Sequence, residues 1–169
     1  AEAIKQMTVP AGFEVTAFVA EPDIGECIAF CFDDRGRLWT LENYNYKTRK
    51  SHSEDQRNRI QIFEDVNGDG VFDTKKLFTD KLTFSSGIAV GMGGVYVGKP
   101  PELIFIPDAN GDDEPDGEPK ILLDGWGIND RHETLNSFIW GPDGWLYGCH
   151  GVFTRSQVGK PGTPESERQ

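Results

Sequence analysis

The sequence predicts an all-β fold. Apolar and polar residues alternate in short runs, and the segment 12–20 shows this pattern from Phe13 to Val19. Turn residues interrupt the chain at short intervals, while no window keeps a helical period beyond about two turns. Together these observations favour a β-sandwich, a barrel or a propeller over a fold of alternating strands and helices.

The expected strands follow one another along the chain. The first is 12–20, and the stretch 27–43 then predicts a strand, a tight turn at 33–36 and a second strand. The same alternation between flanking turn residues predicts further strands or strand pairs in the segments 59–65, 75–80, 86–100, 102–108, 119–125 and 136–151.

Repeated units select the propeller among these folds. A strand, a Gly-containing turn and a short strand with an aromatic residue recur in 28–43, 87–100 and 137–151. The aromatic residues Trp39, Tyr96 and Tyr147 are 57 and 51 residues apart, and about four strands per such period are typical of propeller blades. Because propellers need at least about four blades, we expect a partial β-propeller of about three blades. The expected domain is 1–169, with blade-like repeats at about 12–62, 63–105 and 106–153 and a polar loop or tail at 154–169.

Charge and composition exclude several function classes. The chain has 17 basic and 28 acidic residues, and this net charge of −11 argues against nucleic acid as a partner, because nucleic-acid binding needs a basic face. The chain contains no apolar run of about 18 residues, so the sequence predicts no membrane-spanning helix. The motifs GxSxG, P-loop and strand-linked GxGxxG are also missing, which leaves the hydrolase and nucleotide sites built on them without support.

The three cysteines predict buried thiols rather than a zinc site. Cys27 and Cys31 lie on one expected strand, where four residues span roughly 13 Å, whereas a disulfide needs Cα atoms within about 7 Å. No CxxC motif is present for zinc. The alternative is a disulfide between Cys149 and one of the other two cysteines.

Two acidic loops, 64–73 and 107–116, have nearly the same sequence and predict Ca²⁺ sites. In the first loop, oxygen ligands fall at alternate positions of an EF-hand-like loop with Gly70 at its sixth position. The expected ligands there are Asp65, Asn67, Asp69, Val71 through its carbonyl, and Asp73. The expected ligands of the second loop are Asp108, Asn110, Asp112, Glu114 and Asp116.

Both loops depart from the EF-hand pattern. Lys76 stands in the first loop where an EF-hand has a bidentate glutamate, and no helices flank the loop. In the second loop Asp113 replaces the glycine, so we expect an awkward backbone there. The alternative is that both loops only form hairpin turns, in which Asn and Asp side chains bond their own backbone. Under either interpretation the role is structural, with each loop joining two outer strands of a blade.

Motifs along nearly the whole chain resemble one known family. They lie in the segments 10–22, 32–46, 60–73, 93–112 and 129–151. These segments resemble the N-terminal propeller of a family described as membrane-bound dehydrogenases, abundant in planctomycetes and verrucomicrobia. That family is distantly similar to the soluble aldose and sorbosone dehydrogenases that use pyrroloquinoline quinone (PQQ). The resemblance implies a propeller of the six-bladed type, of which this chain would be about the first half, in an extracytoplasmic protein, periplasmic, secreted or membrane-associated.

The resemblance also implies site residues. In the quinone-dependent relatives, a histidine shortly before a GPDGxLY strand acts as general base and takes the substrate hydroxyl proton. The matching residue is His132, and an imidazole with a pKa near 6.5 suits that role. Arg131, Asn136 and His150 are the expected contacts to cofactor or substrate, Arg131 through an anionic group such as a quinone carboxylate. The alternative for both histidines is a loop or packing residue without a catalytic part.

Two functions remain as hypotheses. The first is a sugar or alcohol dehydrogenase that passes electrons to a c-type cytochrome domain, with the remainder of the propeller as a further partner. In that case we expect the chain alone to be inactive and to bind no c-type haem, since it has no CxxCH motif. The second is a calcium-stabilised propeller module that binds glycan or protein partners without catalysis. The residues suggest Ca²⁺ as a cofactor, while PQQ rests on the resemblance alone.

Overall fold

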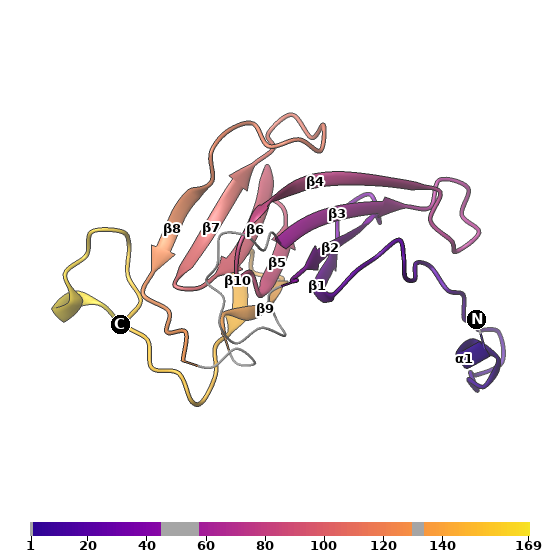
Figure 1. The fold of residues 1–169 in the computed structure, drawn as a ribbon, viewed down its shortest axis with the longest axis horizontal. Coiled ribbons are helices and arrows are strands. Elements are labelled where there is room, and N and C mark those ends of the chain that lie inside the picture. The colour runs from indigo at the N-terminus through magenta and orange to yellow at the C-terminus, as the bar shows by residue number, and fades with distance from the viewer. Residues whose placement is uncertain (1, 45–57, 130–133) are drawn as a thin grey trace.

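The computed structural model describes residues 2–44, 58–129 and 134–169. Within these residues the fold is all-β, with ten strands in three antiparallel sheets that follow one another along the chain (Figure 1). Helix is confined to one short turn near the N-terminus, α1 (Glu2–Lys5), and a 3₁₀ turn at Glu165–Glu167. The prediction of an all-β fold is therefore confirmed.

Each of the first two sheets is a four-stranded meander in which every strand pairs with its sequence neighbour. The first sheet contains β1 (Cys27–Phe32), β2 (Leu38–Glu42), β3 (Asn58–Glu64) and β4 (Thr74–Leu82). The second contains β5 (Gly87–Val90), β6 (Gly94–Lys99), β7 (Glu102–Pro107) and β8 (Lys120–Asp124). The third is a hairpin of β9 (Asn136–Trp140) and β10 (Leu146–Cys149).

The first strand of each sheet lies next to the first strand of the following sheet. β1 contacts β5, and β5 contacts β9. The acidic loops join the third strand to the fourth, the first loop between β3 and β4 and the second between β7 and β8. The tight turn predicted at 33–36 is confirmed between β1 and β2, where Gly36 has φ 78°.

The main core lies between the first two sheets. Its buried apolar side chains alternate along the strands with residues of the opposite face, as a sheet with one packed face requires. Trp39 and Phe78 meet in an edge contact with ring centroids 5.1 Å apart. The other members of this core include Leu41, Ile60, Ile62, Leu82, Ile88, Val95, Val97, Ile104 and Ile106.

The strand expected at 12–20 does not form. Its apolar alternation indicates a half-buried extended segment, but alternation alone supplies no ladder partner. The segment instead lies against the first acidic loop: the Phe72 N–H donates to the Phe18 carbonyl at 3.2 Å, and the Thr16 hydroxyl donates to the Gly70 carbonyl at 3.0 Å. The sheets also divide the chain differently from the expected repeats. The expected boundary between residues 62 and 63 falls inside β3, and β3 pairs with β4 in the first sheet.

The three cysteines are free thiols, as the main prediction for them requires, but they are not all buried. Cys27 and Cys149 are exposed and Cys31 is half-buried, so the expectation of buried thiols is wrong for the first two. Cys27 and Cys31 both lie on β1 and do not pair with each other. Within the described residues, no helix is long and apolar enough to cross a membrane.

Candidate functional site

The first acidic loop is organised by its first carboxylate. Asp65 follows β3, and its Oδ1 accepts the N–H groups of Gly68 at 2.6 Å and Asp69 at 3.2 Å. Its Oδ2 accepts the N–H of Gly70 at 2.8 Å. These N–H bonds, that of Gly70 above all, lower the pKa of Asp65 because they favour the charged form.

The last carboxylate closes the same loop. Asp73 Oδ2 accepts the N–H groups of Val66 at 2.7 Å and Asn67 at 3.1 Å, and the Asn67 amide donates to Asp73 Oδ1 at 3.0 Å. Such bonds are those of the hairpin-turn alternative, in which the loop holds its own shape. They do not fill the ligand capacity of the loop, since each carboxylate offers about four acceptor sites.

The second acidic loop repeats this local pattern with fewer bonds. Asp108 Oδ1 and Asn110 Oδ1 both accept the Asp112 N–H, at 3.2 Å and 3.1 Å. Asp112 Oδ1 accepts the Glu114 N–H at 3.0 Å, and Asp116 Oδ2 accepts the Ala109 N–H at 2.6 Å. Within the described residues, no three His, Cys, Asp or Glu side chains are grouped as metal ligands in either loop.

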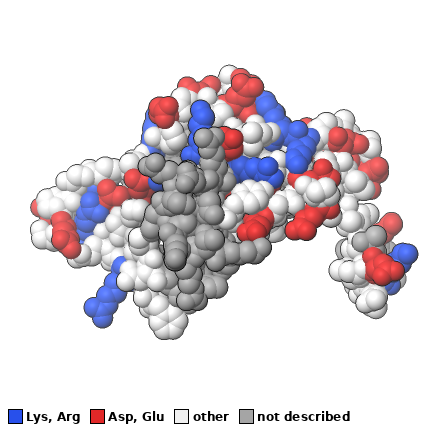
Figure 2. Space-filling model, in the orientation of Figure 1, with Lys and Arg blue, Asp and Glu red and all other residues white. Residues whose placement is uncertain are grey.

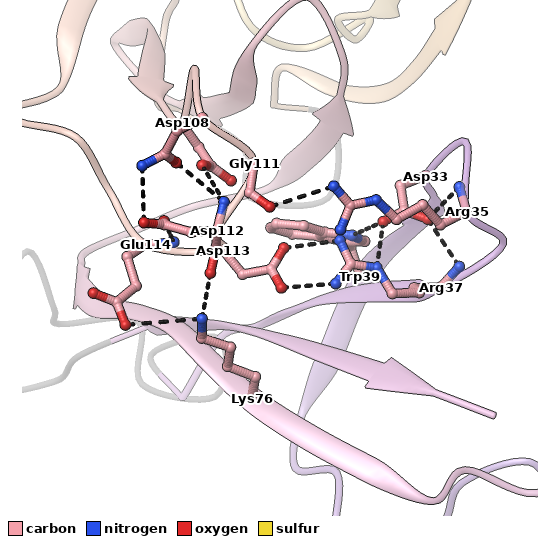
Figure 3. Close-up of polar contacts among 11 residues, drawn as sticks. Asp33, Arg35, Arg37, Trp39, Lys76, Asp108, Gly111, Asp112, Asp113 and Glu114 are labelled. Atoms are coloured by element: carbon pink, nitrogen blue, oxygen red, sulfur yellow. Dashed lines mark hydrogen bonds and ion pairs between the residues drawn. The ribbon is translucent and has the colours of Figure 1, made fainter. Parts of the chain in front are cut away.

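The residue at the sixth position separates the two loops. Gly70 has φ 84° in the first loop, and Asp113 has φ 65° in the second, so the expected awkward backbone at Asp113 is confirmed. The Asp113 carboxylate accepts two parallel hydrogen bonds from Arg37, which directly precedes β2 (Figure 3). Its oxygens lie 2.7 Å from Nη1 and 2.8 Å from Nη2. The two side chains are only 8% and 14% exposed, so this is a partly dehydrated, bidentate ion pair between two sheets.

Arg37 is held from the other side by Asp33. Asp33 Oδ1 accepts the backbone N–H groups of Arg35 at 3.0 Å and Arg37 at 2.9 Å. Its Oδ2 accepts Arg37 Nε at 2.8 Å and the Trp39 indole N–H at 2.9 Å. Burial raises the pKa of Asp33, but the bonds from Trp39 and Arg37 outweigh burial and leave that pKa lowered. The Arg37 guanidinium likewise lowers the pKa of Asp113.

Two further basic residues of the first sheet reach the second loop. Lys76 on β4 donates to the Asp112 carbonyl and lies 3.8 Å from the Glu114 carboxylate. Arg35 donates to the Gly111 carbonyl at 3.3 Å. Figure 2 shows one face of the molecule, where basic and acidic side chains are intermixed along its upper side. Among the described residues, no ion pair joins the first acidic loop to a Lys or Arg.

Sequence reasoning missed this Asp33–Arg37–Asp113 network. Its Arg37–Asp113 contact joins residues 76 positions apart, so no local pattern contains both of these partners. One signal was present: an aspartate at a loop position that prefers glycine is costly unless its side chain has a role.

A cleft of about 510 Å³ opens beside the network. It is lined by the turns after β1 and β5, by the second acidic loop and by Trp140 at the end of β9. The Trp140 indole donates to the Val90 carbonyl at 2.9 Å, and its ring contacts Tyr96 edge-on at 5.3 Å, so Trp140 joins the second and third sheets. Trp145, by contrast, is 72% exposed. Because the turns after β1 and β5, the second acidic loop and Trp140 line the same cleft, they lie at one edge of the sheets.

The residues expected at a catalytic site belong to the opposite edge or lie outside the described residues. Asn136 opens β9 and pairs with Cys149 across the hairpin, at the end remote from Trp140. His150 follows β10, and its Nε2 lies 2.6 Å from the Ser156 hydroxyl oxygen. That oxygen also accepts the Gly127 N–H at 2.8 Å. Arg131 and His132, which precede β9 in the sequence, are outside the described residues.

Comparison with known proteins gives one match. A domain of unknown function, DUF7133, matches residues 1–168. The chain belongs to the DUF7133 family. The DUF7133 match includes all three sheets, both acidic loops and the Asp33–Arg37–Asp113 network. No curated protein and no solved structure matches the chain.

Proposed function

We propose that this DUF7133 chain forms consecutive blades of a β-propeller. One observation carries the proposal: two four-stranded antiparallel meanders and a hairpin follow each other, and their first strands β1, β5 and β9 lie side by side. Propeller blades are four-stranded sheets repeated around a central axis, with neighbouring strands linked in sequence order. A six-bladed ring rests on the resemblance described above.

We further propose that the complete propeller is an extracytoplasmic dehydrogenase of a sugar or an alcohol. Its site would lie at the edge that carries Asn136 and His150. His132 removes the hydroxyl proton of the substrate, a task suited to an imidazole with an unperturbed pKa near 6.5. PQQ, when bound, supplies the hydride acceptor, and a c-type cytochrome domain then takes the electrons. A Ca²⁺ ion in the first acidic loop would stabilise the opposite edge without entering the reaction.

Reconstitution tests the enzymatic proposal. The full-length protein is supplied with PQQ and Ca²⁺, and reduction of an electron-accepting dye is followed with a panel of sugars and alcohols. We expect dye reduction with at least one substrate and its loss in His132→Ala. His52→Ala serves as the matched control, because it removes another histidine of the same chain and should keep the activity. A protein that stays inactive with every substrate, or an active His132→Ala variant, would contradict the proposal.

A second candidate is a propeller module that binds glycans or proteins without catalysis. The contact between His150 and Ser156 favours it, because one of the expected site histidines is already engaged in a bond within the chain. A glycan array separates the candidates: selective binding by the intact protein, together with no dye reduction, supports the module.

A further inference from the structure

The two acidic loops have nearly the same sequence but different surroundings. The first is bonded to its own backbone and to the N-terminal segment, through Thr16 and Phe18. The second is bonded to the first sheet by a guanidinium and an ammonium group, from Arg37 and Lys76. A cluster of carboxylates repels itself unless a cation lies among them, and here the chain itself supplies that cation to one loop.

We propose that the second acidic loop is a docking loop for Arg37 and not a Ca²⁺ site. In this assignment Arg37 and Lys76 offset part of the charge of the loop's five carboxylates, and the loop fixes the second sheet against the first. The inference deepens the proposed function, since it assigns any Ca²⁺ of this region to the first loop alone.

The geometry at Asp113 supports the docking role. A left-handed backbone is costly for a residue with a side chain and free of that cost for glycine. The first loop has glycine at this position and, among the described residues, forms no hydrogen bond or ion pair with Arg37. The second has Asp113, whose carboxylate meets both terminal nitrogens of Arg37. The strained backbone therefore directs a side chain toward the neighbouring sheet.

The docking contacts come from three side chains at two separate points of the first sheet. Arg37 and Arg35 lie on the turn between β1 and β2, and Lys76 lies on β4 at the far end of the sheet's strand order. Figure 3 shows the second loop lying across these side chains, with Asp113 directed at Arg37 and Glu114 at Lys76. Contacts this widely spaced resist rotation of one sheet against the other, which a single ion pair would not.

The charges also leave little for a metal to gain. Lys76 already engages two of the expected ligand residues, because its ammonium group donates to the Asp112 carbonyl and lies 3.8 Å from the Glu114 carboxylate. A divalent ion beside these groups would be repelled by that ammonium group. The first loop has no such cation among the described residues, so a Ca²⁺ ion there would meet uncompensated carboxylates. The identity of the sixth residue, glycine or aspartate, would then distinguish a free loop from a docked one.

A double-mutant cycle with Ca²⁺ titration tests the inference on the purified protein. Unfolding constants are measured by urea denaturation for Asp113→Asn, Arg37→Lys and the double variant. We expect the two substitutions to be coupled by about tenfold or more, as contacting residues of one network are. Independent, additive effects would overturn the docking role. The Trp39 indole N–H resonance gives a second readout, because that group bonds Asp33 in the same network and should shift in Asp113→Asn.

The metal arm compares the Ca²⁺-induced rise in melting temperature in Asp108→Asn and in the matched variant Asp65→Asn. We expect Asp108→Asn to respond as the wild type does. A smaller response in Asp108→Asn means that the second loop takes Ca²⁺ and overturns the inference. If Asp65→Asn alone loses the response, the Ca²⁺ site is the first loop. If no protein responds, the proposed Ca²⁺ site of the first loop fails, while coupling between Arg37 and Asp113 still supports docking.

Discussion

Asp33 offers the sharpest test of how the sheets are held together. Its side chain is 4% exposed, and each carboxylate oxygen accepts two hydrogen bonds. Oδ1 accepts from two backbone N–H groups, and Oδ2 accepts from Arg37 Nε and from the Trp39 indole N–H. In Asp33→Asn, one oxygen becomes an NH₂ group that cannot accept. Turning the amide over does not help, because the other pair of partners also consists of donors.

The expected cost follows from the bonds at Oδ2. Both bonds are made to a charged carboxylate, and such a hydrogen bond contributes about 1.5–3 kcal/mol, so losing the Arg37 and Trp39 bonds should cost roughly 3–6 kcal/mol. For a domain of this size the melting temperature should then fall by roughly 6–24 °C. The matched control is Asp34→Asn: Asp34 is the exposed neighbour on the same turn, and its substitution should change stability by less than about 0.5 kcal/mol.

Urea denaturation at neutral pH and thermal melting measure the difference. The same network gives a pH dependence with a definite sign. The pKa of Asp33 is lowered in the folded protein, so its contribution is present above the unfolded pKa near 3.9 and is lost as the pH falls below that value. The acid limb of the stability curve should therefore be shallower in Asp33→Asn. Equal stability of the Asp33 and Asp34 variants would refute this reasoning.

Three further outcomes are expected. Gly94→Ala should destabilise the protein by about 1–3 kcal/mol, measured by urea denaturation, because a new Cβ would overlap the Ile106 carbonyl on the neighbouring strand, whereas Gly117→Ala, which faces open space, should be neutral. Trp140→Phe should cost about 1 kcal/mol in thermal melting, because it removes the indole bond to the second sheet. Neutralising Asp65 by Asp65→Asn should also make the acid limb shallower in a pH titration of stability, since its lowered pKa places its contribution above the unfolded value.

Local signals predicted the strands and turns well. The turn at 33–36 and both loop–strand junctions were found because Gly, Asn and Asp have specific backbone preferences that the chain meets within a few residues. The prediction of a strand at 12–20 was wrong because a strand also needs a pairing partner, which no local pattern supplies. Its alternating pattern predicts that the face with Phe13 is buried, but Phe13 is 71% exposed. The segment instead bonds to the first acidic loop through Thr16 and Phe18, which lie at the intervening positions.

The contacts between sheets could not be predicted in the same way. Arg37 follows a turn rich in charged residues, and Asp113 lies inside an acidic loop. Most charges in such segments are solvated, and nothing local distinguishes the buried pair from its exposed neighbours. Asp113 was noticed as an awkward residue in a glycine position, but its partner depends on how the second sheet packs on the first. That packing is set by the apolar core, so the ion pair is a consequence of the tertiary fold.

The arrangement separates two kinds of substitution. The acidic loops, the Asp33–Arg37–Asp113 network and Trp140 lie at one edge of the sheets, while Asn136 and His150 lie at the other end of the third hairpin. The strands of the first two sheets pass between these edges through a packed core, so a local change in side-chain contacts at the acidic loops makes no direct contact with the groups at the other edge. Substitutions at the acidic edge should therefore change stability, and those at the opposite edge should change ligand binding or turnover. A variant of Asp113 that lost function while keeping wild-type stability would show that the two edges are coupled.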